Sequence, residues 1–131
     1  LTAVARDGAG NSTTSAAVTV TVVSAAPTLA ALQSSFFGPR CSICHTGGGA
    51  TLPASMNLSS ASATAAALIG VTSQEVPALK RVAPGDPNNS YVIQKIEGTA
   101  AVGSRMPLGG PFLSQAESDQ IRAWIQAGAA P

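Results

Sequence analysis

The chain has 131 residues, a formal net charge of +1 and only 10% charged residues. This length allows one small domain with an extension, and the near-neutral charge gives no indication of a nucleic acid partner. Aromatic residues make up only 4% of the chain, so a domain of this size would have a thin core without a further apolar group. No transmembrane segment is predicted, because the most apolar run, residues 18–32, is interrupted by threonines and Pro27.

The N-terminal segment, residues 1–23, is predicted to form a β-hairpin extension. Residues 1–6 form the first expected strand and residues 7–11 a turn, in which glycines can take positive φ. Residues 13–23 form the second expected strand, because their valines alternate with threonines. The valines that share one face are Val18, Val20 and Val22.

This N-terminal stretch resembles the last two strands of a bacterial immunoglobulin-like domain, which needs about seven strands. A two-stranded hairpin by itself is marginally stable in water. Three interpretations stay open: a remnant of a longer multidomain protein, a hairpin that packs on its own chain, or a strand donor to a neighbouring subunit. Donation that repeats from head to tail would build a filament.

Residues 24–27 are predicted to be a linker, and residues 28–131 a mainly α-helical domain. The first helix is expected to begin at Thr28 and to end at Gly38 and Pro39, just before a cysteine motif. Its large apolar residues recur at helical spacing and form one stripe. They are Leu29, Leu32, Phe36 and Phe37.

Two further helices are expected in the middle of the domain. Residues 59–69 are rich in alanine and are closed by Gly70. Farther along, Asp86 is predicted to cap a helix whose first residue is Pro87 and which stops at Gly98.

The last helix is predicted from a capping box. Ser114 and Glu117 have the S-x-x-E spacing of this motif. They open a helix over residues 115–127, and Gly128 stands just past its end. Trp124 is expected to pack against the first helix rather than to relay electrons.

The chemistry of the chain is concentrated in the run Cys41-Ser42-Ile43-Cys44-His45. A C-x-x-C-H run is the attachment site of a c-type haem, with two thioether bonds from the cysteines and the histidine as an iron ligand. The alternatives are a disulfide, a thioredoxin-like redox pair and half of a zinc site. Zinc would need further ligands, and the chain has no other cysteine or histidine.

Three stretches together resemble class I c-type cytochromes. They are a helix that leads into the motif at 41–45, the run at 84–96 and the Arg-Met-Pro run at 105–107. The resemblance covers residues 27–131. It implies a small cytochrome c-like helical domain around one covalent haem c.

The resemblance also implies a methionine as the second axial ligand of the iron. Met106 is the expected ligand, because it stands in a loop just before the last helix and Pro107 stiffens the backbone beside it. Met56 is the alternative, with a core-filling role as its other interpretation. An empty or water-filled position is the third possibility.

Groups around the expected haem can also be proposed from the sequence. The carbonyl of Pro53 is a candidate acceptor for the Nδ1 proton of His45, since haem histidines need a partner that fixes their tautomer. Arg105 is a candidate partner of a haem propionate, and Arg81 and Lys95 are weaker candidates. Tyr91, in turn, is expected in the core or in the haem wall.

These features predict an electron carrier, not an enzyme. Haem attachment to this motif takes place outside the cytoplasm, so the expected location is periplasmic or extracellular, although this chain contains no signal peptide. The expected partners are a redox protein or neighbouring copies of the chain in an oligomer or filament. The alternative is a monomeric cytochrome module of a larger multidomain protein, and a haem sensor or peroxidase is the third class.

Overall fold

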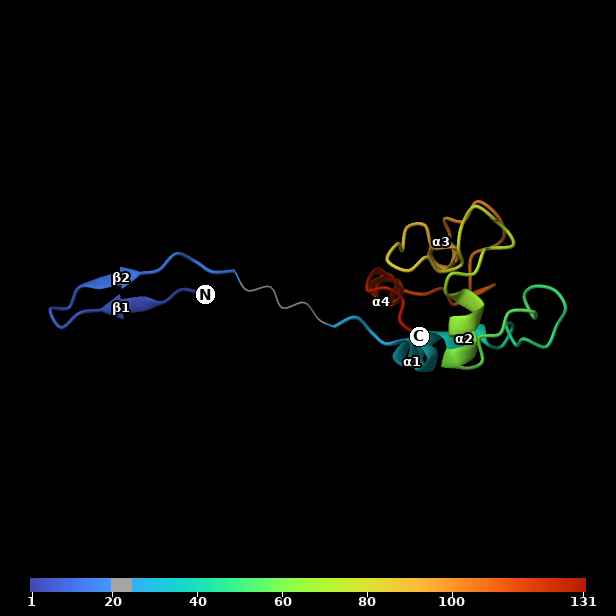
Figure 1. Cartoon of the computed structure of the whole chain (residues 1–131), viewed down its shortest axis with the longest axis horizontal. Coiled ribbons are helices and arrows are strands. Elements are labelled where there is room, and N and C mark those ends of the chain that lie inside the picture. Colours follow the sequence, from blue (N-terminus) through green and yellow to red (C-terminus); the bar gives the residue numbers. More distant parts are fainter. Residues whose placement is uncertain (20–24) are drawn as a thin grey trace.

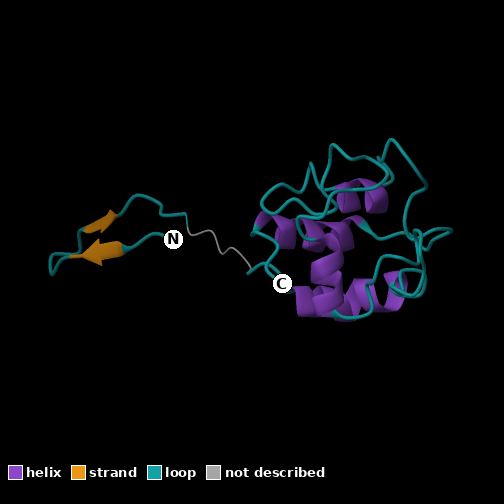
Figure 2. Ribbon diagram, turned by 45° about the vertical axis from the view of Figure 1, so that its right-hand side comes forward, coloured by secondary structure: helices purple, strands orange, loops and turns teal. Residues whose placement is uncertain are grey.

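The computed structural model describes residues 1–19 and 25–131. Within these residues it confirms the coarse prediction of an α-rich domain preceded by a β-hairpin (Figure 1). Long loops join the helices of the domain (Figure 2). The helices are α1 (Leu29–Leu32), η1 (Gln33–Cys41), α2 (Ala61–Leu68), α3 (Tyr91–Glu97) and α4 (Gln115–Gln126). None of those described has the length and apolar character needed to cross a bilayer.

The hairpin pairs β1 (Val4–Arg6) with β2 (Ser12–Thr14) in antiparallel register. Its turn is closed by the carboxylate of Asp7, which accepts hydrogen bonds from the backbone N–H groups of Ala9 at 3.0 Å and Asn11 at 2.9 Å. A hydrogen bond from the Asn11 side chain, together with these backbone bonds, lowers the pKa of Asp7. The turn prediction is therefore confirmed.

The first strand begins at Val4 and not at Leu1, so it is shorter than predicted. The second strand is also shorter than predicted. It ends at Thr14, although the two arms of the hairpin pair again where the backbone of Val18 and that of Leu1 exchange hydrogen bonds of 2.7 and 2.8 Å. The prediction of a strand over 15–19 is wrong, because the side-chain hydroxyl of Ser15, and not a backbone carbonyl, accepts from the Ala3 N–H at 3.0 Å and interrupts the ladder. Val20 and Val22 lie outside the described residues.

The prediction that Gly38 and Pro39 end the first helix is wrong. Helix α1 begins after Thr28, whose hydroxyl accepts from the Ala31 N–H, and it continues through η1 to Cys41. Proline disrupts the hydrogen bonding of an α-helix, but η1 is a wider π-helix, in which bonds span five residues. Gly38 allows this winding, since a Cβ there would lie 2.7 Å from the carbonyl oxygen of Gln33.

Helix α2 confirms the prediction for residues 59–69. The Ser60 hydroxyl accepts from the Ala63 N–H at 3.2 Å, and Gly70 follows with φ of +70°. The helix therefore has the start and the end that its flanking residues indicate.

Helix α3 begins at Tyr91, so the prediction of a helix starting at Pro87 is wrong. The Asp86 carboxylate closes a turn instead, and accepts from the backbone and side-chain N–H groups of Asn89 at 3.2 and 2.7 Å. Ser90 is the residue that precedes the helix. The expected end is confirmed, because Gly98 closes α3 in a left-handed conformation with φ of +78°.

The capping box that opens α4 is confirmed. Ser114 accepts from the backbone N–H of Glu117, and the Glu117 carboxylate accepts from that of Ser114 at 2.7 Å. Farther along α4, Trp124 packs edge-on against Phe37, with ring centroids 6.4 Å apart and planes at 68°. The predicted contact between the last helix and the first helical segment is thus confirmed.

One hydrophobic core joins these helices. Helix α1 contacts α2 and α4, α2 contacts η1, and α3 contacts α4. The buried side chains of the core come from all of these helices and from the loops between them. The largest that are fully buried are Leu29, Leu32, Ile93, Ile121 and Ile125.

Candidate functional site

A cavity of about 530 Å³ lies among η1, the end of α2, α3, α4 and the loops that join these helices. This volume falls in the range of about 300–1,000 Å³ that is usual for small-molecule and cofactor sites. Most of the lining side chains are apolar. The four side chains that the sequence predicts to bind a haem, Cys41, Cys44, His45 and Met106, all line it.

The motif 41–45 forms a tight turn directly after η1. The Cys41 carbonyl oxygen accepts from the N–H groups of Cys44 at 3.2 Å and His45 at 3.0 Å. Both thiols are free, with Cys41 half-buried and Cys44 exposed. Burial raises the pKa of the Cys41 thiol to about 11. Between the cysteines, Ile43 is 75% exposed, so the motif stands at the mouth of the cavity.

His45 has the hydrogen bond that the sequence predicts. Its Nδ1 lies 2.9 Å from the carbonyl oxygen of Pro53, and a carbonyl can only accept, so Nδ1 carries the proton. Burial lowers the pKa of His45, against the opposing effect of the Pro53 hydrogen bond. The imidazole is then neutral at neutral pH, and Nε2 carries the lone pair that a metal requires.

Both methionines line the cavity, but they come from different loops. Met56 belongs to the loop that carries Pro53, and its N–H donates to the Pro53 carbonyl at 3.2 Å. Met106 belongs to the loop after α3, and its N–H donates to the Lys95 carbonyl at 2.9 Å. Met56 is thus tied to the partner of His45, whereas Met106 reaches the cavity from a separate part of the fold.

Only two of the three charged residues that the sequence proposes as partners of a haem propionate lie at the cavity. Arg81 and Lys95 line the cavity, and Arg105 does not. Arg81 donates to the Ala67 carbonyl at 2.8 Å, and Lys95 pairs with Glu75 at 2.9 Å. The role of Arg105 at a propionate stays a prediction that no contact of this side chain supports.

Tyr91 forms part of the cavity wall, as expected. Its side chain is 5% exposed, and its hydroxyl donates to the Val102 carbonyl at 2.6 Å. Burial, with the nearby Glu75 carboxylate, raises the pKa of Tyr91 to about 12. The phenol therefore stays neutral and can donate this hydrogen bond over the whole physiological range.

Sequence reasoning missed Arg40, which also lines the cavity. Its Nη2 pairs with Glu117 at 3.0 Å, while its Nη1 is buried without a hydrogen-bond partner among the described residues. The only sequence signal was its place directly before Cys41. An unpartnered buried donor is costly, so an acceptor that reached Nη1 of Arg40 would stabilise this wall.

The donors in the cavity fit a haem better than a zinc ion. A structural zinc ion takes four protein ligands, and residues 1–19 and 25–131 gather no group of three or more His, Cys, Asp or Glu side chains that could hold a metal. A haem brings four ring nitrogens of its own and needs only axial ligands, such as an imidazole and a thioether. His45 and Met106 supply one of each, and the apolar wall suits the porphyrin.

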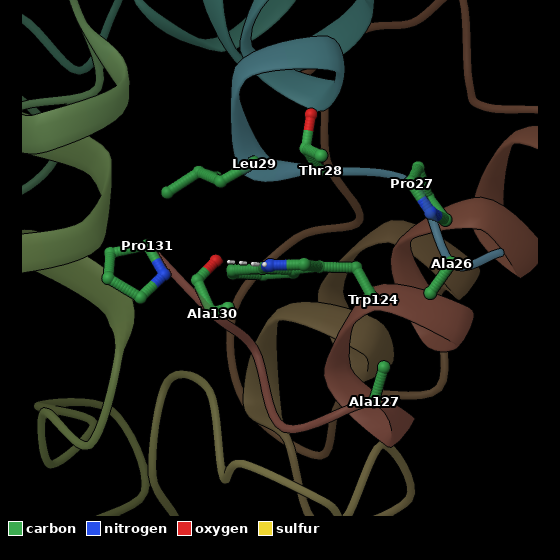
Figure 3. A pocket seen from close by; sticks show the side chains of 8 residues that line it. All are labelled: Ala26, Pro27, Thr28, Leu29, Trp124, Ala127, Ala130 and Pro131. Atoms are coloured by element: carbon green, nitrogen blue, oxygen red, sulfur yellow. Dashed lines mark hydrogen bonds between the residues drawn. The ribbon is translucent and has the colours of Figure 1, made fainter.

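A second cavity of about 180 Å³ lies where the helical domain begins and ends (Figure 3). The Trp124 indole lies along it and donates through Nε1 to the Ala130 carbonyl at 2.8 Å. The other lining residues are Ala26, Pro27, Thr28, Leu29, Ala127 and Pro131. Apart from the Thr28 hydroxyl, which caps α1, no titratable or nucleophilic side chain of the described residues lines it.

Comparisons of the chain with protein-family models, with curated proteins and with solved structures find no match. The resemblance to class I c-type cytochromes therefore rests on the C-x-x-C-H and Arg-Met-Pro motifs. A function for the chain has to be argued from these motifs and from the side chains that line the larger cavity.

Proposed function

We propose that the chain binds one haem c covalently and transfers single electrons outside the cytoplasm. The observation that carries this proposal is the cavity of about 530 Å³, whose wall includes Cys41, Cys44, His45 and Met106. Three of these residues come from the motif at the end of η1, and Met106 comes from a loop far along the sequence. The proposed fold is accordingly a cytochrome c-like domain.

Each residue has a distinct part in the proposal. Cys41 and Cys44 form thioethers to the haem, and His45 and Met106 are the axial ligands of its iron. When bound, the haem supplies one-electron chemistry, which protein side chains lack. The Pro53 carbonyl holds the proton on Nδ1 of His45, which leaves Nε2 for the iron.

The ligand set favours a carrier over an enzyme. With His45 and Met106 both bound, the iron has no open position for a substrate, and His/Met ligation raises the reduction potential. With a haem in place, the apolar wall of the cavity would keep water away from the iron. Because thioether attachment takes place outside the cytoplasm, the proposed location is periplasmic or extracellular.

A redox titration of the native protein tests this function. We expect one reversible one-electron step, followed through the haem absorption bands, and a low-spin spectrum in both oxidation states. A high-spin ferric protein that binds carbon monoxide on reduction, or turns over peroxide, would instead favour the sensor or peroxidase class.

The exposed hairpin favours a second level of function, a filament of repeated subunits. All of residues 1–19 are exposed, and within the described part of the chain β1 and β2 contact each other and no helix. Leu1 is 87%, Val4 57% and Val18 61% exposed. Unpaired strand edges with apolar side chains are suited to pairing with another chain. Donation to the next subunit would place the haems in a row.

Deletion of residues 1–23 tests the filament. Electron microscopy of the native protein is expected to show fibres, and the deletion is expected to abolish them while the haem spectrum stays unchanged. A full-length protein that remains a monomer at all concentrations would contradict the filament and would favour a module of a larger multidomain protein. The unchanged spectrum is the control, since it reports a helical domain that still folds.

A further inference from the structure

We propose that Arg105 is a positioning residue, which fixes the loop carrying Met106 to the C-terminal end of α3. This role replaces the one at a haem propionate that the sequence suggested. The inference rests on the proposed function, because it concerns the approach of the Met106 sulfur to the iron.

The first contact is a hydrogen bond to the end of α3. The Nε–H of Arg105 donates to the Ile96 carbonyl at 2.9 Å, and the backbone N–H of Met106 donates to the Lys95 carbonyl at 2.9 Å. The last carbonyls of a helix have no partner within it. Arg105 and Met106 thus donate to two consecutive carbonyls of α3. The positively charged guanidinium of Arg105 lies at the C-terminal end of the helix, where the helix dipole is negative.

The second contact is close packing on both sides of the arginine. A Cβ at Gly98 would lie 2.7 Å from Cδ of Arg105, so the arginine stem lies directly against the glycine backbone. On the guanidinium, Cζ lies 4.2 Å from the ring centroid of Phe112. Phe112 follows Met106 in the same loop, so the arginine connects both flanks of the methionine to α3.

The third observation is that, of the neighbouring side chains of Arg105 and Met106, only one lines the cavity. Met106 lines the cavity, and Arg105 does not. In the segment around them, Gly103, Gly109 and Gly110 all have positive φ, and glycine restricts the backbone least. Besides Arg105, the nearest side-chain anchor of this loop is the hydroxyl of Tyr91 on the Val102 carbonyl at 2.6 Å. Removal of Arg105 therefore leaves the part of the loop that carries the methionine attached to α3 only through the backbone N–H of Met106.

Imidazole binding to the ferric protein provides the test, because imidazole competes with the methionine for the iron. We expect Arg105→Gln to raise the imidazole affinity about tenfold, which corresponds to about 1.4 kcal/mol and to the loss of one charge-assisted hydrogen bond. The matched control is Arg122→Gln. Arg122 also contacts α3, through Glu97 at 2.7 Å, but not the Met106 loop, so we expect an unchanged affinity.

Two more variants separate positioning from charge. Arg105→Lys keeps the charge but loses the planar guanidinium, and we expect it to behave as Arg105→Gln does. Phe112→Leu removes the stacking partner of Arg105 and should raise the imidazole affinity by a smaller factor. This variant provides the test if the Arg105 variants do not assemble. Three results would overturn the positioning role. They are an unchanged imidazole affinity in Arg105→Gln, an equal rise of this affinity in Arg122→Gln, and an unchanged affinity in Arg105→Lys when Arg105→Gln shows the rise. A wild-type protein without haem, or without a methionine to displace, would overturn the proposed function itself.

Discussion

Met106→Ala is expected to turn a low-spin haem protein into a high-spin one and to remove its weak far-red absorption band completely. The band reports a sulfur-to-iron bond, and alanine cannot supply the sulfur. The reduction potential should fall as well, because the thioether favours ferrous iron. Absorption spectra of the ferric protein, with a redox titration, measure both effects.

Met56→Ala is the matched control for this substitution. Met56 lines the same cavity but packs beside the core cluster in the loop of Pro53. Its removal should cost about 2 kcal/mol of stability, the lower end of the range for a methionine in a core, and should leave the far-red band in place. If the band disappears in Met56→Ala and persists in Met106→Ala, the ligand assignment is reversed.

The second large effect is expected when both thiols are removed. Cys41→Ala with Cys44→Ala should abolish covalent haem and with it the cooperative thermal transition of the domain. Without the haem, the apolar side chains that line the cavity of about 530 Å³ lose their packing partner and face water. The stability of a typical domain is only about 5–15 kcal/mol, so the loss of this contact is expected to be a large part of it.

Ser42→Ala is the control for the double substitution. Ser42 lies between the cysteines, and its hydroxyl donates to the Gly38 carbonyl at 2.5 Å, so alanine changes the same turn and keeps both thiols. Haem staining after denaturation should give the wild-type result. Thermal melting followed by circular dichroism should keep a cooperative transition, lowered only by the loss of one hydrogen bond, about 1 kcal/mol. A sharp melt in the double cysteine variant at the wild-type temperature would contradict a structural role of the haem.

The elements that sequence predicted well are those that local chemistry determines. The capping box of Ser114 and Glu117 is a contact between neighbours, and Gly98 ends α3 because its left-handed conformation suits glycine. Predictions failed where the same residue suits two different local structures. Asp86 can cap a helix or close a turn, and the turn wins because Ser90 connects it to the Ala83 backbone. Pro39 would end an α-helix but is accepted in a π-helix.

The same distinction applies to the candidate site. The motif identified Cys41, Cys44 and His45 without any knowledge of the fold, and general haem chemistry led to the Pro53 carbonyl. Arg40 could not be found in this way, because its significance depends on a contact with Glu117, which is remote in sequence. Contacts of this kind follow from the packing of α4 against the first helical segment, not from a local pattern.

The central claim is the covalent haem, and the intact mass of the denatured native protein tests it most directly. The protein should be purified from the periplasmic or extracellular fraction of cells that attach haem to c-type cytochromes. Since thiols add to the vinyl groups without loss of atoms, the predicted mass is the sum of the chain and one haem. The mass of the chain alone, or that mass less two hydrogens from a disulfide between Cys41 and Cys44, would contradict the account.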